Sequence, residues 1–463
     1  MPLQTTHPLT VSSGDYKDQL LADLQITEGF NDGKPYIDKV PSPAIATIGY
    51  GFNIETVAAY MALTLNQMGI LGNKTAAETQ QILGEFIVAA RAATGPTTLA
   101  ATTDLRNRLN PLAQQYGVSE FSISTSQART IYNQILEGAT IVVTSGNPLV
   151  IPSKQTRLDA ILGNSLAHNT LEYVALMSLF YNTESLVAAG SKLATAVING
   201  ERAEAWYEIR YRSNGDGIHA ARRIDESNLF SLYNNPGQGV GEAEAKEVLR
   251  MYTTHRDAIL DYEIRFGTQF PASGTSTVQF QLIGAKTTLI PLYAHGFTID
   301  GEVLVGQDAE PALALFETLK GTSNGDLLFG EGGRDVLEGR MGRDVLYGGD
   351  GFDTLVGGIG DDWLEGGEGL DTYRWSTGDG HDRIEDSDAS GVIVVNGQML
   401  VGGIKKAGHT DWTSLDGTIT YAMAGTDLIL ERDGTTIMTV NENFQSGQLG
   451  IRLINAARER MAA

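Results

Sequence analysis

Aspartate recurs at strict intervals of nine residues between positions 326 and 371, and this repeat restricts the fold of the chain more than any other feature. A glycine stands five residues before each aspartate, and a leucine or tyrosine stands two residues after it. The aspartates are Asp326, Asp335, Asp344, Asp353, Asp362 and Asp371. Such units predict a stack of similar turns, because a single repeat cannot bury its own apolar side chain and needs neighbours on both sides.

The residue types in the repeat indicate that it binds calcium. Glycine permits tight turns with positive φ whose carbonyl groups point inward, and aspartate adds a carboxylate oxygen. Oxygen ligands, in a chain with no Cys and no clustered His, favour Ca²⁺ over zinc or copper. A disordered linker is the alternative, but a linker has no reason to keep its leucines in phase. The predicted metal ligands are the six aspartates, Asp379 and Asp382 in the next segment, and Gly330, Gly333, Gly339, Gly342, Gly348, Gly351, Gly357, Gly360, Gly366 and Gly369.

Units such as GGDGFDTLV and GGIGDDWLE resemble the calcium-binding nonapeptides of the RTX proteins. The resemblance implies a parallel β-roll over residues 321–390 that holds several structural Ca²⁺ ions. The following WSTGDGHDRIED resembles the closing segment of such arrays. RTX proteins are substrates of type I secretion, which implies a partner secretion machinery and an uncleaved signal among the C-terminal residues. Injection into the periplasm of a rival cell is equally compatible with the sequence.

The overall composition excludes several classes of protein. With 33 Lys+Arg against 56 Asp+Glu, the net charge is −23, so we expect no nucleic-acid partner. The absence of Cys excludes a disulfide framework and a cysteine nucleophile. No apolar stretch reaches the roughly 18 residues that a membrane span needs. The N-terminal MPLQTTHPLTVSSGDYKDQL lacks the basic and apolar regions of a Sec signal, which predicts secretion by another route.

The charge and the glycines concentrate in the repeat, and this shift in composition predicts a multidomain protein. The C-terminal part should be all-β, whereas the N-terminal part is mainly helical in pattern. The predicted segments are an N-terminal domain at 1–235, a connector at 236–320, the β-roll at 321–390 and a β region at 391–463. Within the connector we predict a polar helix from about 242 to 266, followed by strands within 277–306.

A carboxyl group stands on the apolar stripe of the first predicted helix. Tyr16, Leu20 and Leu24 recur at intervals of four, and Glu28 is the next position in the series. Burial and the negative end of the helix dipole both disfavour an ionised carboxylate there, so the pKa should be raised. A glutamic acid held in its protonated form is what a glycosidase needs to protonate a leaving-group oxygen.

Glu28, Asp38 and Thr47, in the frame TEGF–YIDK–ATIGYGFN, resemble the catalytic signature of the bacteriophage-type lysozymes (glycoside hydrolase family 24). LEYVALMSLFYN and the segments after it resemble the second lobe of that family, so the resemblance covers about residues 14–54 and 155–233. It implies a mainly-α (α+β) lysozyme-like domain. In the family the Glu is the general acid, and the Asp with the Thr positions the attacking water, which inverts the anomeric carbon.

This sequence departs from the family in two places. The loop KVPSPAIA between Asp38 and Thr47 is longer than usual, and residues 55–154 form an insert between the two lobes. The insert is helical in pattern, with a capping box at Ser124 and Gln127 ahead of a helix that ends at Gly138. Extra packing around the core and a lid over the substrate are the two interpretations of the insert.

The resemblance implies a muramidase that hydrolyses the β-1,4 bond between N-acetylmuramic acid and N-acetylglucosamine in bacterial peptidoglycan. Asn182, Arg212 and Arg223 are candidates for substrate binding, although buried amide and Arg side chains usually hold helices together. An immunity protein would be a further partner. Two alternatives remain: a non-catalytic, calcium-dependent wall-binding or adhesive protein, and a lytic transglycosylase. The second is disfavoured because such enzymes dispense with the water-holding carboxylate.

Overall fold

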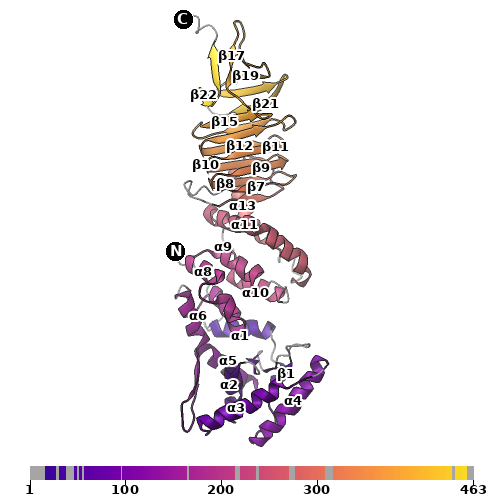
Figure 1. Ribbon diagram of the computed structural model, residues 1–463, viewed down its shortest axis with the longest axis vertical. Coiled ribbons are helices and arrows are strands. Elements are labelled where there is room, and N and C mark those ends of the chain that lie inside the picture. The colour runs from indigo at the N-terminus through magenta and orange to yellow at the C-terminus, as the bar shows by residue number, and fades with distance from the viewer. Residues whose placement is uncertain are drawn as a thin grey trace. The chain divides into compact units, whose positions relative to one another are not determined.

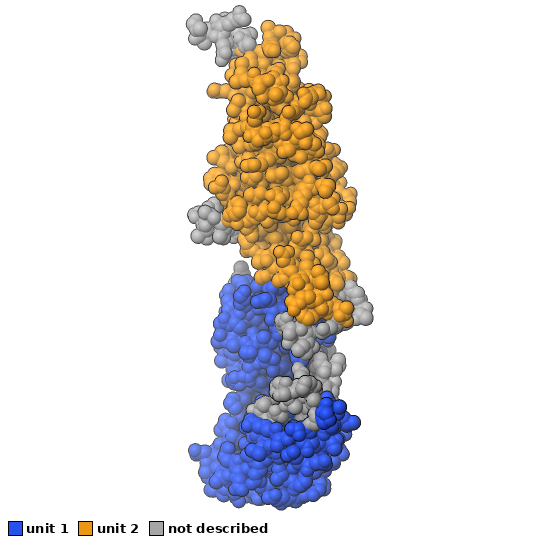
Figure 2. Space-filling model, turned by 45° about the vertical axis from the view of Figure 1, so that its right-hand side comes forward, with its two compact units in different colours: residues 1–234 blue, residues 235–463 orange. Residues whose placement is uncertain are grey.

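The computed structural model forms two compact units, Met1–Asn234 and Asn235–Ala463, which Figure 2 shows in different colours. The residues that the structure describes are 16–27, 31–37, 46–48, 52–54, 57–94, 96–163, 166–213, 219–235, 239–270, 277–307, 316–440 and 444–455.

The first unit begins with a helix and a small antiparallel sheet. Helix α1 spans Tyr16–Thr27, and Tyr16 and Leu20 of its predicted stripe are buried. The sheet has the strand order β1-β2-β3. Its strands are β1 (Tyr36–Ile37), β2 (Ala46–Ile48) and β3 (Phe52–Asn53). Thr47 lies opposite Tyr36, and Ala46 lies opposite Ile37.

The insert is largely helical, as its pattern predicts. Its elements are α2 (Ala58–Gln67), α3 (Ala76–Arg91), α4 (Thr98–Gln115), α5 (Thr125–Glu137) and the hairpin of β4 (Ala139–Ile141) and β5 (Leu149–Ile151). The predicted capping box is present: the Ser124 hydroxyl accepts from the Gln127 N–H, and the Gln127 side chain accepts from the Ser124 N–H. Gly138 ends α5 with a φ of 84°, a value that glycine adopts without strain.

The remaining helices of the first unit surround α7 (Leu171–Asn182), which is apolar on nearly every side and buried from Glu172 to Tyr181. The surrounding elements are α6 (Lys154–Leu162), α8 (Lys192–Asn199), α9 (Arg202–Tyr207), the π-helical turn η3 (Glu208–Arg212) and α10 (Ala220–Phe230). Glu172 pairs with Arg202 at 2.8 Å, so the charge inside this core is compensated.

The second unit begins with helices, and here one prediction was wrong. Helix α11 (Glu242–Phe266) lies where it was predicted. Residues 277–293, predicted as strands, form α12 (Val278–Gln281) and α13 (Ile283–Tyr293). Val278, Leu282, Ala285 and Leu289 are fully buried at helical intervals of four, three and four. The free energy gained by burial of this apolar face favours a helix, although the β-branched residues of the segment favour strands. The first strand after the helices is β6 (Val303–Val305).

The repeats form two parallel sheets, which confirms the predicted β-roll (Figure 1). One sheet contains β8 (Leu327–Gly333), β10 (Val345–Gly351), β12 (Trp363–Gly369) and β14 (Asp382–Glu385). The other contains β7 (Thr318–Lys320), β9 (Val336–Met341), β11 (Thr354–Ile359), β13 (Asp371–Trp375) and β15 (Gly391–Val395). Leu346 lies beside Leu328 and Leu364, two repeats away in each direction, and all three are fully buried between the sheets.

The C-terminal residues extend both sheets of the roll. Strand β16 (Gln398–Met399) pairs with β15, while β21 pairs in parallel with β14 and continues the first sheet to eleven strands. The strands added to the first sheet are β17 (Gly402–Lys405), β18 (Trp412–Ser414), β19 (Ile419–Ala424), β20 (Asp427–Arg432), β21 (Thr435–Val440) and β23 (Arg452–Asn455). The short strand β22 (Ser446–Leu449) contacts β23 and β15. Among the described residues, no helix is both long and apolar enough to cross a membrane.

Candidate calcium sites and candidate active site

Each repeat aspartate stands at a corner of the roll and is at most 2 % exposed. One of its carboxylate oxygens is bound to the backbone two repeats earlier. Asp344 Oδ1 accepts from the Asp326 N–H at 2.8 Å, and Asp362 Oδ1 accepts from the Asp344 N–H at 2.8 Å. The second column of corners repeats the pattern, since Asp353 Oδ1 accepts from the Asp335 N–H at 2.7 Å. These bonds fix the orientation of every carboxylate.

The other carboxylate oxygen is buried and has no hydrogen-bond partner. This holds for Oδ2 of Asp335, Asp344, Asp353, Asp362, Asp371 and Asp382. Burial of an ionised oxygen without a partner raises the free energy of the folded state by about several kcal/mol, unless a cation compensates the charge. The repeated orphan oxygen therefore fits a bound metal ion at these six corners, whereas Oδ2 of Asp326 accepts from the Thr322 N–H at 2.6 Å.

The repeat glycines make room for that ion. A Cβ added at Gly339 or Gly357 would overlap the free Oδ2 of Asp344 or Asp362, five residues later in the chain. Gly342, Gly351 and Gly360, which are also predicted metal ligands, each stand two residues before a repeat aspartate and have positive φ. A Cβ at Gly351 would overlap the Gly333 carbonyl oxygen of the turn below. The glycines thus bring backbone carbonyls and carboxylates close together, which suits the oxygen-only coordination of Ca²⁺.

Asp382 ends one column of corners, in the segment that was predicted to close the array. Asp382 is fully buried, and its Oδ1 accepts from the Asp362 N–H at 3.2 Å. Asp379 lies close enough to repel the Asp382 charge electrostatically, together with Asp361. Within the described parts of the chain, no three His, Asp or Glu side chains form a metal site by themselves.

Comparison with protein families supports the same chemistry. Residues 316–346 and 339–373 match the model of the RTX calcium-binding nonapeptide repeat (4 copies). These residues are RTX calcium-binding repeats. The RTX repeats bind Ca²⁺ as a structural ion, and their aspartates are buried. The chain matches no curated protein.

The RTX match begins before the first predicted repeat, and the structure shows why. Glu317 stands nine residues before Asp326, and its N–H donates to Asp335 Oδ1 at 3.0 Å, as repeat aspartates do. Its own Oε2 accepts from the Gln307 N–H at 2.6 Å. Glu317 therefore occupies the aspartate position of a preceding turn. Counting back nine residues would have found it, but the pattern was defined on aspartate alone.

Burial in the calcium-free RTX repeats raises the pKa of Asp344 to about 8, with a further increase from the charges of Asp362 and Asp326. Burial likewise raises the pKa of Asp353 to about 6 and that of Asp382 to about 9. Because these values exceed the ordinary 3.8, the folded calcium-free roll binds more protons than the unfolded chain. These carboxyl groups therefore contribute to the stability of the calcium-free roll fully below about pH 4, and their contribution is lost as the pH rises through about 6 to 9.

Calcium competes with these protons, so we expect calcium to bind more tightly at higher pH. The calcium concentration at the folding midpoint should be higher at pH 5.5 than at pH 7.5, and binding should release protons. Calcium titrations followed by circular dichroism at both pH values, with proton release measured in weak buffer, check this. An identical midpoint at the two pH values would contradict it.

Gly357→Ala should raise the calcium concentration needed for folding several-fold. The new Cβ would overlap the Asp362 carboxylate, and forced overpacking of this kind costs about 1–3 kcal/mol. Gly267→Ala is the matched control, because a Cβ at Gly267 meets no atom within 4 Å. Titration of the two variants should separate them, and equal midpoints would show that the glycine is not needed at the corner.

Of the predicted catalytic residues, Glu28 and Asp38 lie outside the described residues. In the chain, Glu28 follows the last residue of α1, and Asp38 follows the last residue of β1. Thr47 lies in β2, is 4 % exposed, and donates from Oγ1 to the Tyr36 carbonyl at 3.3 Å. The pairing of β1 with β2 holds both ends of the long loop together, so the extra loop length does not remove Thr47 from the sheet.

The three predicted substrate-binding residues differ in their surroundings. Asn182 is exposed at the end of α7, and its Nδ2 donates to the Ser178 carbonyl at 2.8 Å. Arg212 is exposed at the end of η3. Arg223 is buried on α10 and pairs with Glu226, which also accepts from Ser178 of α7 at 2.7 Å. These contacts favour a structural role for Arg223, which helps to hold α10 against α7.

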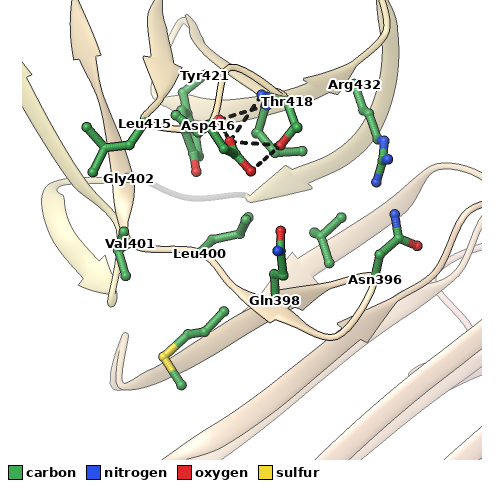
Figure 3. A pocket seen from close by; sticks show the side chains of 14 residues that line it. Asn396, Gln398, Leu400, Val401, Gly402, Leu415, Asp416, Thr418, Tyr421 and Arg432 are labelled. Carbon is green, nitrogen blue, oxygen red and sulfur yellow. Dashed lines mark hydrogen bonds between the residues drawn. The ribbon is translucent and has the colours of Figure 1, made fainter.

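A cavity of about 560 Å³ lies in the C-terminal β region (Figure 3). Its wall mixes apolar side chains such as Leu400 with polar ones such as Gln398 and Arg432. Asp416 accepts from Ser414 Oγ at 2.6 Å and from the Thr418 hydroxyl at 2.9 Å. These bonds lower the pKa of Asp416 and keep it ionised. Asp416 therefore cannot serve as the protonated acid that glycoside hydrolysis needs.

Proposed function

We propose that the protein is a muramidase whose calcium-folded RTX module serves export or delivery. The observation that carries the proposal is the frame TEGF–YIDK–ATIGYGFN, which resembles a family 24 active site. The arrangement of α1, the sheet β1-β2-β3 and the helices around α7 is compatible with it.

In the proposed reaction Glu28 protonates the glycosidic oxygen as the bond to the anomeric carbon breaks. Asp38 accepts a proton from a water molecule, which attacks the anomeric carbon from the opposite face and inverts it. The Thr47 hydroxyl donates its hydrogen to the Tyr36 carbonyl, so its remaining lone pair can accept a hydrogen bond from that water. Glu28 ends ionised and Asp38 protonated, and proton exchange with solvent restores both.

Folding of the RTX module depends on the calcium concentration around it, which differs between the inside and the outside of the cell. Sites of the extracellular type bind calcium in the range of about 10⁻⁴–10⁻³ M, which is far above cytosolic levels. The repeats would therefore remain unfolded inside the producing cell and fold outside it. RTX repeats are typical of proteins exported by type I secretion, and this supports a secreted protein that does not use the Sec route.

Incubation of the purified full chain with insoluble peptidoglycan in millimolar calcium tests the proposal. A muramidase releases soluble muropeptides with time. The non-catalytic alternative predicts that the chain sediments with the peptidoglycan in a calcium-dependent way without releasing fragments. That second outcome would overturn the enzymatic proposal.

A further inference from the structure

Two side chains stand where the repeat otherwise requires glycine. From Gly330 onward, the residue after each corner glycine has positive φ, and in the later turns it is Gly349, Gly358 or Gly367. In the first two of these turns, one in each sheet, it is Glu331, with φ 71°, or Arg340, with φ 84°. A residue with a side chain in this conformation costs about 1–2 kcal/mol.

The stacking of turns explains where a side chain fits at this position. A Cβ at Gly349 would overlap the Glu331 carbonyl oxygen, and a Cβ at Gly358 would overlap that of Arg340. Later turns must therefore keep glycine. Glu331 belongs to β8, and the only strand before it in its sheet is the short β6, which pairs with Leu327–Phe329. The first turn consequently has room for a side chain at this position.

Glu331 uses that room to bind helix α11. Lys246 Nζ lies 2.8 Å from Glu331 Oε1, and Arg250 Nη2 lies 3.1 Å from Oε2. The two cations are one helical turn apart on α11, so both carboxylate oxygens are paired. The Glu331 side chain is only 14 % exposed, which reduces screening by solvent. Lys246 also lies over the Phe329 ring, 5.0 Å from its centre.

The same face of α11 covers the start of the roll. Arg250 Nε donates to the Gly306 carbonyl at 2.8 Å, and the Val305 N–H donates to Thr253 Oγ1 at 3.0 Å. Gln307 Nε2 donates to Thr254 Oγ1 at 2.6 Å. Since β6 is the terminal strand of the eleven-stranded sheet, these bonds satisfy polar groups beside an open edge (Figure 1).

We propose that α11 is the N-terminal cap of the RTX roll and that Glu331 is the latch between them. The Glu331 carboxylate can reach Lys246 and Arg250 only after β8, which includes the corner glycine Gly330, has folded. Calcium-driven folding of the first turns and docking of α11 are therefore one coupled event. Arg340, at the equivalent position of the next turn, is exposed and has no ion pair among the described residues. The proposal does not depend on enzymatic activity.

Hydrogen exchange of the α11 amides in the full chain tests the latch. Glu331→Ala and Arg340→Ala form a matched pair, since both keep a Cβ at positive φ in consecutive turns. In calcium, Glu331→Ala should reduce the protection of α11 about tenfold or more, whereas Arg340→Ala should leave it unchanged. Wild type with a calcium chelator should also lose α11 protection. Equal protection in the two variants, or protection that survives chelation, would overturn the proposal.

A second variant covers the case in which Glu331→Ala prevents the roll from folding. The Lys246 side chain belongs to α11 and forms no part of a calcium corner, so Lys246→Ala should leave the β-sheet circular dichroism signal intact in calcium. It should still lower the protection of α11. The double variant Lys246→Ala/Glu331→Ala should lose less protection than the sum of the single losses, because both remove the same ion pair. Strictly additive losses would show that the two residues are not coupled.

Discussion

Chelation of calcium should unfold the RTX repeats and remove most of the β-sheet circular dichroism signal of the second unit. Six buried carboxylate oxygens lack partners without the ion, and the charges of residues 321–374 are mostly negative. At neutral pH, repulsion and desolvation would then act together against the folded roll. The described helices of the first unit contain no such carboxylate array, so their signal should persist.

Millimolar Ca²⁺ should restore the β signal, while Mg²⁺ at the same concentration should not. Mg²⁺ demands shorter distances and octahedral geometry, which rigid corners of stacked carbonyls do not offer. Asp344→Asn is a suitable variant, because it keeps the shape of the side chain and removes its charge. It should raise the calcium midpoint, whereas Asp416→Asn, outside the repeats, should not. A roll that stays folded in chelator at pH 7.5 would contradict the structural role of calcium.

Glu28→Gln should lower the rate of peptidoglycan hydrolysis by about 10²–10⁴-fold, the usual contribution of a general acid. Glutamine keeps the size of the side chain but cannot release a proton to the glycosidic oxygen. The measurement is the initial rate of muropeptide release at saturating peptidoglycan, where the loss should appear in kcat.

Glu120→Gln is the matched control for this variant. Glu120 belongs to the first unit, and its described ion pair is the partly exposed one with Lys34 at 2.9 Å. Its replacement should leave the hydrolysis rate within about twofold of wild type, since exposed ion pairs contribute about 0–1 kcal/mol. Equal rates for wild type and Glu28→Gln would show that Glu28 is not the acid.

The roll could be predicted residue by residue because each nine-residue unit of the sequence forms one strand and one corner, and two units complete one turn of the roll. The nine-residue phase of Asp344 and Leu346 places one at a corner and the other between the sheets, and the structure has both there. Local chemistry decides this pattern, so one sequence is sufficient to recognise it. Thr47 likewise lies on a strand, although the positions of Glu28 and Asp38 remain a prediction.

Features that depend on long-range packing could not be predicted. The segment around Leu282 and Leu289 is rich in β-branched residues, and only its burial against α11 selects a helix. The ion pairs of Glu331 could not be predicted from the repeat, because its partners Lys246 and Arg250 lie about 80 residues earlier in the chain. A helix and the turn that it caps share no sequence period, so the repeat pattern does not predict the contact between them.

The mass of the products released from purified peptidoglycan tests the central claim most directly. Hydrolysis adds water, so wild type should release muropeptides with reducing N-acetylmuramic acid ends, and Glu28→Gln should release almost none. Products with 1,6-anhydro ends would show that no water was used and would identify a lytic transglycosylase instead. The absence of soluble fragments from a calcium-loaded, folded wild-type chain would contradict a muramidase altogether.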